Sequence, residues 1–291
     1  MKKLSISFIG TGALGGVMAR AAAMAGFPIK SVFNRSIAPA RKLAGEIGAE
    51  QFGEFPRQIK SLGKLIFLTV PDRHIEGAAE KLAGVEKNFD DYFVAHCSGN
   101  KPSAVLHSLQ KRGAAVAAFH PIQTFSPAST PADFRDIFID IEGDNKSVDF
   151  FKNFAAELGC TPMEIAPEAK PYLHAAAVMA SNYLVALLES AGQMAEMGGI
   201  DGKEARGALM PLVQKNVSNI ARSDKLLDAL SGPISRGDSD TVADHLKLLE
   251  SNPPLATLYR KLGQVLIQSI RENGRLPKQK INELFEILDE Q

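Results

Sequence analysis

The chain has 291 residues, which is long enough to bury a large core and to divide into two domains. Its 33 Lys and Arg residues balance its 33 Asp and Glu residues, so the formal net charge is zero at pH 7. This balance excludes the broad basic surface that nucleic acids and anionic membranes attract, and we expect neither as a partner. The two cysteines, Cys97 and Cys160, lie in apolar segments and indicate the reduced, packed thiols of a cytoplasmic protein, not a disulfide framework.

The first 33 residues predict the order strand, glycine-rich turn, helix and strand. An apolar run over residues 4–9 predicts the first strand, an Ala-rich segment over 16–24 predicts the helix, and residues 29–33 predict the second strand. The turn itself reads Gly10-Thr11-Gly12-Ala13-Leu14-Gly15, which has the spacing G-x-G-x-x-G. Such a turn can be merely structural, but between a strand and a helix this spacing is typical of dinucleotide binding.

Each glycine of this turn has a physical role in the expected cofactor site. Gly10 permits the tight turn out of the strand, Gly12 lets a pyrophosphate approach the backbone, and Gly15 lets the helix pack closely on the strand. The free N–H groups at the start of the helix would then hold the phosphates. We expect residues 10–15 to bind the cofactor, together with Val70 and Pro71 at the end of a neighbouring strand.

The end of the second strand predicts which dinucleotide is bound. NAD-binding proteins usually carry Asp or Glu there, roughly 20 residues beyond the glycines, to bind the ribose 2′-OH. Here the chain reads Asn34-Arg35-Ser36, with no carboxylate. The guanidinium of Arg35 can form charge-assisted hydrogen bonds with a 2′-phosphate, and the two neighbours add neutral donors. The alternative is a solvated surface Arg. We favour NADP(H) as the cofactor.

Strands and helices then alternate up to about residue 166. This alternation predicts an α/β fold, a doubly wound Rossmann domain with right-handed crossovers over residues 1–166. Its further strands are expected over 65–70, 92–95, 114–119 and 137–141, and its further helices over 38–47, 74–82, 103–111 and 147–158.

The rest of the chain, residues 167–291, predicts an all-helical C-terminal domain. Its helices are expected over 172–197, 203–221, 241–249, 255–271 and 278–288. The apolar run over 175–188 contains Ser181, Asn182 and Tyr183 and falls short of the ~20 apolar residues that span a bilayer. We expect its helix to be buried, and a homodimer packed largely through the helical domain.

Ligands of doubly wound sheets bind at the carboxyl ends of the strands, which selects two candidates for chemistry. His120 ends the strand over 114–119 and could polarise a substrate or donate a proton beside the nicotinamide. The alternative, which we favour less, is a capping residue that bonds only its own loop. Ser98 follows the strand over 92–95, where its hydroxyl could hold a substrate oxygen.

Three more candidates lie on the first helix of the helical domain. Lys170 and His174 are four residues apart and share a helix face, and Asn182 lies two further steps of four along the chain. In a helix otherwise filled with apolar residues, buried polar side chains need partners. These side chains are either satisfied inside the helical domain or line a cleft beneath the nicotinamide, and we favour the cleft for His174.

On these motifs the chain resembles the Rossmann-like NADP oxidoreductases that carry a C-terminal helical domain of unassigned function. The resemblance covers nearly the whole chain and also rests on His96-Cys97-Ser98-Gly99, His120-Pro121-Ile122-Gln123-Thr124-Phe125 and Gly232-Pro233-Ile234-Ser235-Arg236-Gly237-Asp238. More distantly the chain is similar to pyrroline-5-carboxylate reductase, ketopantoate reductase, prephenate dehydrogenase and the 3-hydroxyacid dehydrogenases. His120-Pro121 looks like the catalytic His-Pro of prephenate dehydrogenases, and Lys170-x-x-x-His174 like the Lys-x-x-x-Asn of hydroxyacid dehydrogenases, with His in place of Asn.

Two functions are compatible with these features. The first is an NADP(H)-dependent oxidoreductase that transfers a hydride to or from a small carbonyl, hydroxy-acid or imine substrate, with His120 or His174 supplying the proton. The second is a non-catalytic NADP(H)-binding or sensing protein whose helical domain changes its self-association. The convergence of polar groups favours the enzyme, whereas the sequence contains no evident catalytic triad or metal-ligand cluster.

Overall fold

The computed structural model describes residues 3–289, and its contacts divide the chain into two compact units. The division falls between Ser181 and Asn182, inside helix α6 (Lys170–Met197). The last strand ends at Glu164 and helical segments follow it, so the secondary structure changes close to the residue 166 at which we drew the boundary. The compact units divide later because the first turns of α6 pack with the sheet.

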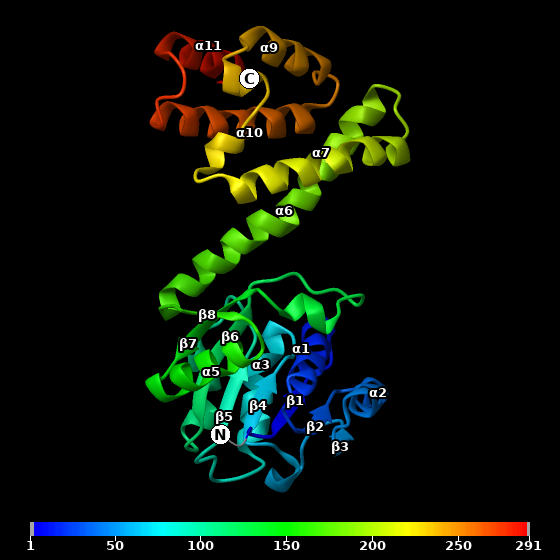
Figure 1. The fold of residues 1–291 in the computed structure, drawn as a ribbon, viewed down its shortest axis with the longest axis vertical. Helices are drawn as coiled ribbons and strands as arrows, with labels where there is room; N and C mark the ends of the chain where they lie inside the picture. Colours follow the sequence, from blue (N-terminus) through cyan, green and yellow to red (C-terminus); the bar gives the residue numbers. More distant parts are fainter. Residues whose placement is uncertain (1–2, 290–291) are drawn as a thin grey trace. The chain divides into compact units, whose positions relative to one another are not determined.

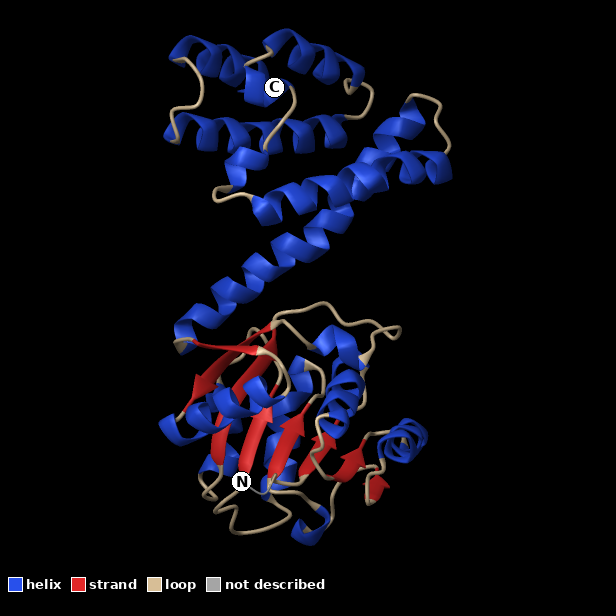
Figure 2. Ribbon diagram, in the orientation of Figure 1, coloured by secondary structure: helices blue, strands red, loops and turns tan. Residues whose placement is uncertain are grey.

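One eight-stranded sheet forms the centre of the first unit (Figure 1, Figure 2). Its spatial order is β3-β2-β1-β4-β5-β6-β7-β8, and the first six of these strands pair in parallel. The predicted doubly wound Rossmann fold is therefore confirmed. The strands are β1 (Ile6–Ile9), β2 (Ile29–Phe33), β3 (Gln51–Gly53), β4 (Leu65–Leu68), β5 (Phe93–His96), β6 (Ala115–Pro121), β7 (Phe138–Gly143) and β8 (Thr161–Glu164).

Helices cover both faces of this sheet, as its continuous apolar strands require. All four residues of β4 are buried. One core layer contains residues of α1, α2 and α5, and the other contains residues of α3, η3 and α4. The bounds are α1 (Ala13–Met24), α2 (Ile37–Ile47), η1 (Ile59–Ser61), η2 (Asp72–His74), α3 (Ile75–Ala83), η3 (Ser103–Leu106), α4 (His107–Gln110), η4 (Pro131–Phe134), α5 (Asn145–Glu157) and η5 (Pro167–Ala169).

The far edge of the sheet departs from the predicted crossovers. Strand β7 runs antiparallel to β6, and the short strands β3 and β8 were not predicted. A parallel return usually needs a crossover helix, whereas the segment between β6 and β7 contains only the single turn η4. In the resulting register His120 lies directly opposite Asp140.

The second unit is helical, as predicted. Its core is formed by Val242 and Leu246 of α9, Ile267 of α10, and Ile281, Leu284 and Leu288 of α11. Side chains cap three of its helices: Asp201 caps the start of α7, Asp238 the start of α9 and Asn252 the start of α10. After α6 the bounds are α7 (Gly202–Arg222), η6 (Leu226–Ala229), α8 (Pro233–Arg236), α9 (Ser239–Leu248), α10 (Pro253–Glu272) and α11 (Lys278–Asp289).

Helix α6 is exposed along nearly its whole length, so the expectation that it is buried is wrong for the single chain. Among its 28 residues only Lys170 is buried. By length and composition alone, the segment Pro167–Met197 could cross a membrane, with a mean hydropathy of 1.3. It is longer than the run over 175–188 considered above. One such helix is weak evidence for a membrane span, because apolar helices of soluble proteins pass the same test.

Candidate functional site

Two glycines of the first turn are required by the packing of the protein itself. Gly10 has a φ of +117°, and a methyl group added there would lie 2.5 Å from the carbonyl oxygen of Thr69. A methyl group added at Gly15 would lie 2.5 Å from the carbonyl oxygen of Gly10 and 2.6 Å from Oγ1 of Thr69. That hydroxyl donates a hydrogen bond of 2.8 Å to the same Gly10 oxygen, which joins the turn to the end of β4.

Gly12 differs, because the described residues do not explain why it lacks a side chain. No described atom outside its own chain neighbours lies within 4 Å of a methyl group added there, and its φ of −65° suits any residue. It is the N-cap of α1, and no side chain in the described structure caps this helix. The turn therefore leaves open space at a helix N-terminus, where backbone N–H groups favour an anion. The residues fit a bound pyrophosphate.

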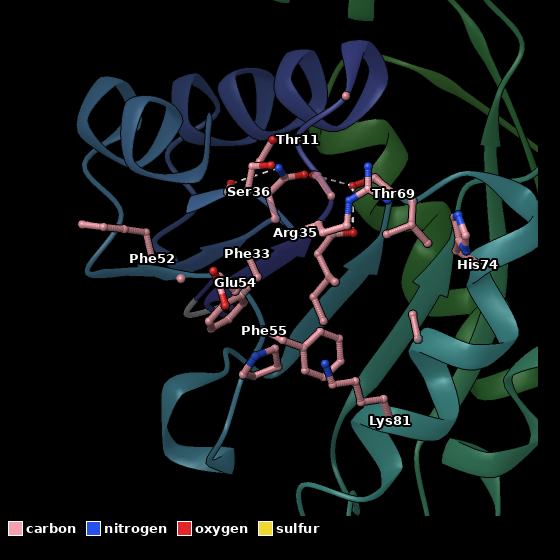
Figure 3. Close-up of a pocket in the computed structure, with 18 of the residues that line it drawn as sticks. Thr11, Phe33, Arg35, Ser36, Phe52, Glu54, Phe55, Thr69, His74 and Lys81 are labelled. Carbon is pink, nitrogen blue, oxygen red and sulfur yellow. Dashed lines mark hydrogen bonds between the residues drawn. The ribbon is translucent and has the colours of Figure 1, made fainter. Parts of the chain in front are cut away.

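A cavity of about 1430 Å³ opens at this turn (Figure 3). Its lining includes all but one of the predicted cofactor residues, namely Gly10, Thr11, Gly12, Ala13, Leu14, Asn34, Arg35, Ser36, Val70 and Pro71. The exception is Gly15, which packs against Gly10 and Thr69.

The charged lining of the cavity is mainly basic. Arg35, Arg57, Lys60, Arg73 and Lys81 face two acidic residues, Glu54 and Asp72. The ammonium of Lys81 lies 4.2 Å from the ring centroid of Phe55. The basic lining thus suits a polyanionic ligand.

Ser98 lies next to this cavity, with its hydroxyl engaged in hydrogen bonds. Its Oγ donates to the carboxylate of Asp72 at 2.6 Å and accepts from the backbone N–H groups of Asn100 and Lys101. Asp72 lines the cavity, and so does Cys97, the residue before Ser98. The hydroxyl proton is thereby committed to Asp72, which makes Ser98 suited to shaping the turn between the cavity and the next strand.

The most concentrated polar group of the first unit centres on Asp140, which the sequence reading did not select. Its Oδ2 lies 2.5 Å from Nδ1 of His120, and its Oδ1 lies 2.5 Å from Nζ of Lys170. The side chain of Lys170 is 0% exposed, that of Asp140 1% and that of His120 15%. Lys170 is thus placed to hold Asp140, with no access to a substrate, and His120 is the member that reaches solvent.

His174 completes this group from the second turn of α6. Its ring centroid lies 5.9 Å from that of His120, and its buried Nδ1 has no hydrogen-bond partner among the described residues. A methyl group added at Gly99 would lie 2.6 Å from that Nδ1 and 2.8 Å from Nε2 of His120. Two imidazole nitrogens therefore converge on the bare backbone of Gly99, one residue beyond Ser98.

Two further titratable groups, His96 and Cys97, lie beside these residues and stay neutral near pH 7. Burial lowers the pKa of His96 to about 4, and its two ring nitrogens bond Ser98 N–H and the Pro102 carbonyl. Burial raises the pKa of the Cys97 thiol well above its usual range. Cys160 is likewise buried and free, and burial raises its pKa to about 11.

Asn182 is the predicted site residue that the first unit does not contain. It is the first residue of the second unit, and its side chain is exposed on α6. The Asp140 group is complete among residues of the first unit.

Asp140 and Gly99 are the site residues that sequence reasoning missed. The one sequence signal for Asp140 is a carboxylate between two apolar residues, in Phe138-Ile139-Asp140-Ile141. Such a residue in a buried strand needs a charged partner, and the partners lie 20 and 30 residues away in sequence.

Comparison with protein-family models assigns both parts of the chain. Residues 1–121 match the Rossmann-like domain, and residues 137–266 match DUF2520, a domain of unknown function. The chain is a Rossmann-like domain followed by a DUF2520 domain. His120 and Gly99 lie in the Rossmann-like part, whereas Asp140, Lys170 and His174 lie in the DUF2520 part. The polar group thus draws its members from both matched regions. No curated protein matches the sequence.

Solved structures share this fold over most of the chain. Protein TM1727 from Thermotoga maritima is 28% identical, with a TM-score of 0.72 over 93% of this chain and 100% of its own. BF3122 from Bacteroides fragilis, provisionally described as an NADP oxidoreductase, is 23% identical, with a TM-score of 0.74 over 91% and 98%. A reductive aminase from Aspergillus terreus in complex with NADPH and ethyl-5-oxohexanoate is 18% identical, with a TM-score of 0.63 over 98% and 99%. At the two lower identities the likeness concerns the fold.

Proposed function

We propose that this protein is an NADP(H)-dependent oxidoreductase acting on a small carbonyl, hydroxy-acid or imine substrate. The observation that carries the proposal is Gly12, whose missing side chain leaves open space at the N-terminus of α1 inside the cavity lining. Similar folds bind NADPH in the reductive aminase complexes. The nicotinamide, when bound, supplies or accepts the hydride.

The chain's own residues would hold the cofactor at two points. Backbone N–H groups at the start of α1 hold the pyrophosphate, and Gly12 gives it access. Arg35, with Asn34 and Ser36, binds the 2′-phosphate that distinguishes NADP(H) from NAD(H). The other cations of the cavity lining add to the attraction for this anion.

His120 would move the proton that accompanies the hydride. Asp140 holds its Nδ1, which leaves Nε2 on the side of Gly99 to donate a proton to a substrate oxygen or nitrogen, or to accept one in the reverse direction. His174 forms the facing wall. Ser98 and Lys170 support this arrangement through Asp72 and Asp140 respectively.

The Gly12→Ala variant tests the cofactor site with a matched control. Its methyl group meets no described atom, so we expect an unchanged melting temperature and NADPH binding weakened at least about tenfold, because the methyl group occupies the pyrophosphate space. Gly45→Ala, in α2 and outside the cavity, adds an equally unhindered methyl group and should bind NADPH like the parent. Equal NADPH affinity of the parent and Gly12→Ala, measured by fluorescence titration, would remove the basis of the proposal.

A substrate panel separates the enzyme from a sensor of NADP(H). Loss of NADPH absorbance with keto acids or imines is expected of an enzyme. Binding of NADPH without turnover of any such compound, accompanied by a change in self-association, would favour the sensor.

We also propose a cytoplasmic homodimer in which a second copy covers α6. The dimer is supported by the exposed apolar side chains of this helix, including Met179, Tyr183 and Val185. The cytoplasmic location is supported by the two buried free thiols. The polar residues Glu189, Gln193 and Glu196 on the same helix favour a protein interface, which can satisfy them, over a bilayer.

A further inference from the structure

The His120–Asp140 pair is set by the pairing of two strands. His120 of β6 and Asp140 of β7 are directly opposed residues of the antiparallel ladder, and their side chains meet at 2.5 Å. Opposed residues of an antiparallel pair point to the same face of a sheet. The geometry therefore does not depend on a loop, as a capping histidine's would.

This contact selects one tautomer of His120. An ionised carboxylate only accepts hydrogen bonds, so Nδ1 of His120 must carry the hydrogen that Asp140 receives. In the neutral imidazole Nε2 then has the lone pair, and in the cation Nε2 has a proton to give. Nε2 is also the atom that lies against Gly99.

Lys170 acts on this pair through Asp140 alone. Its ammonium is 0% exposed and lies 2.5 Å from the second carboxylate oxygen. A buried carboxylate without a neighbouring cation would either be protonated itself or stabilise the cationic form of the neighbouring imidazole. The ammonium of Lys170 is the cation placed against this carboxylate.

We propose that Asp140 and Lys170 are positioning residues, which act as a unit to hold His120 in one tautomer and let its Nε2 both give and take a proton. This assignment rests on the proposed function for its catalytic meaning only. The tautomer and the charge balance concern the folded protein without substrate. Lys170, one of the candidates for chemistry in the sequence, is thereby given a positioning role.

The other groups that face His120 do not obscure a titration of it. His174 faces it from α6, His96 and Cys97 lie nearby on and after β5, and Asp72 of η2 is bonded to Ser98. His96 and Cys97 keep their neutral forms near pH 7, so His174 is the neighbour that must be followed separately.

Nitrogen NMR of the histidine side chains, without substrate or cofactor, tests the proposal. The chain has six histidines, and the spectra of His120→Asn and His174→Asn assign the two resonances. The parent should show His120 with hydrogen on Nδ1. In Lys170→Met the uncompensated Asp140 should raise the midpoint of His120 titration by about one pH unit or more, with the tautomer kept.

Two further variants keep the test decisive if a buried charge prevents folding. In the double variant Asp140→Asn/Lys170→Met both charges are absent, and the midpoint should lie below that of Lys170→Met. Lys152→Met removes a surface lysine that pairs with Glu164, and it should titrate like the parent. An unchanged His120 midpoint in a folded Lys170→Met protein, or hydrogen on Nε2 of neutral His120 in the parent, overturns the proposal.

Kinetics then separate this proposal from the proposed function. Once a substrate is turned over, the limb of the kcat/KM pH profile that reports His120 should move upward in Lys170→Met, as the NMR midpoint does. The NMR shift without any NADPH turnover would refute the oxidoreductase and leave the positioning role intact. If Lys170→Met turns over substrate, and both its NMR midpoint for His120 and its kcat/KM pH profile match the parent, the positioning role alone is refuted.

Discussion

At the scale of single residues, Gly99 sets a tight geometric condition on the two facing histidines. A side chain there would lie within 2.8 Å of ring atoms of both His120 and His174. We expect Gly99→Ala to destabilise the fold by about 1–3 kcal/mol, because one or both imidazoles must move. Denaturant unfolding measures this cost, with Gly45→Ala as the unhindered control, and a Gly99→Ala protein of parental stability with an unchanged His120 spectrum would contradict it.

In the proposed function, Arg35 sets the preference between the two dinucleotides. Arg35→Ala should weaken NADPH binding by about 1–3 kcal/mol and change NADH binding little, because only NADPH has the 2′-phosphate. Arg20→Ala serves as a control, since Arg20 pairs with Glu46 and neither residue lines the cavity. If titrations show both dinucleotides weakened alike by Arg35→Ala, this role is wrong.

Asp140 orients His120, whereas Nδ1 of His174 has no hydrogen-bond partner among the described residues. The two variants should therefore differ in turnover. His120→Asn and His174→Asn should each bind NADPH normally, because neither residue lines the cavity. At least one should lose about 10²–10⁴-fold in turnover, and we expect it to be His120, which Asp140 orients. Parental turnover by both variants would return both histidines to a structural role.

At the residue level, the structure brings together those predicted cofactor residues that are neighbours in the sequence. The glycine turn and the Asn34-Arg35-Ser36 tip are continuous segments, and the structure places all of them but Gly15 around one cavity. The partners of Ser98 and Lys170 could not be read in this way, because Asp72 and Asp140 lie 26 and 30 residues away in sequence. Only the strand pairing brings these carboxylates to them.

At the scale of secondary-structure elements, α6 presents an apolar surface without a described partner. Val185 is 67% exposed and Met179 66% exposed. Apolar side chains of a helix normally pack against a core or a partner, so this exposure indicates a binding surface. We expect light scattering to give a dimer of the 31.3 kDa chain at micromolar concentration, and Val185→Glu to shift it toward monomer.

Leu248→Glu is the matched control for that experiment. Leu248 is 72% exposed on α9, and a charge there should leave the dimer intact. A parent protein that scatters as a monomer would disprove the homodimer. Equal dissociation by both variants would disprove the role of α6.

Most elements could be predicted because their apolar periodicity and end signals are strong. Gly48, for example, ends α2 in the left-handed conformation, with a φ of 66°. The short strands β3 and β8 contain no buried residue, so they give no such signal. The direction of β7 depends on the missing crossover helix, and the exposure of α6 depends on packing that composition does not specify.

At the scale of the whole molecule, the buried His96 links global stability to pH. Burial lowers the pKa of His96 from 6.5 in the unfolded chain to about 4 in the folded protein. Between these two pH values the imidazole is therefore protonated in the unfolded chain but neutral in the folded protein. Stability attributable to this residue is therefore complete above about pH 6.5 and is lost as the pH falls toward 4. The loss between pH 7 and about pH 5 should be about 2 kcal/mol.

The variant His96→Asn isolates this contribution. Its amide oxygen can still accept the N–H of Ser98, but it does not titrate in this range. Chemical unfolding at several pH values should show a flatter acid slope for His96→Asn than for the parent. Parallel slopes would place the acid sensitivity elsewhere in the molecule.

The antiparallel return of β7 also bears on how such a protein can diverge. Because His120 and Asp140 are opposed in the ladder, lengthening the intervening segment, residues 122–137, leaves their pairing untouched, whereas inserting one residue into either strand would separate them. That segment is largely exposed and contains only one short turn. The hairpin connection can thus change in length while the His120–Asp140 pair is kept as part of the sheet itself.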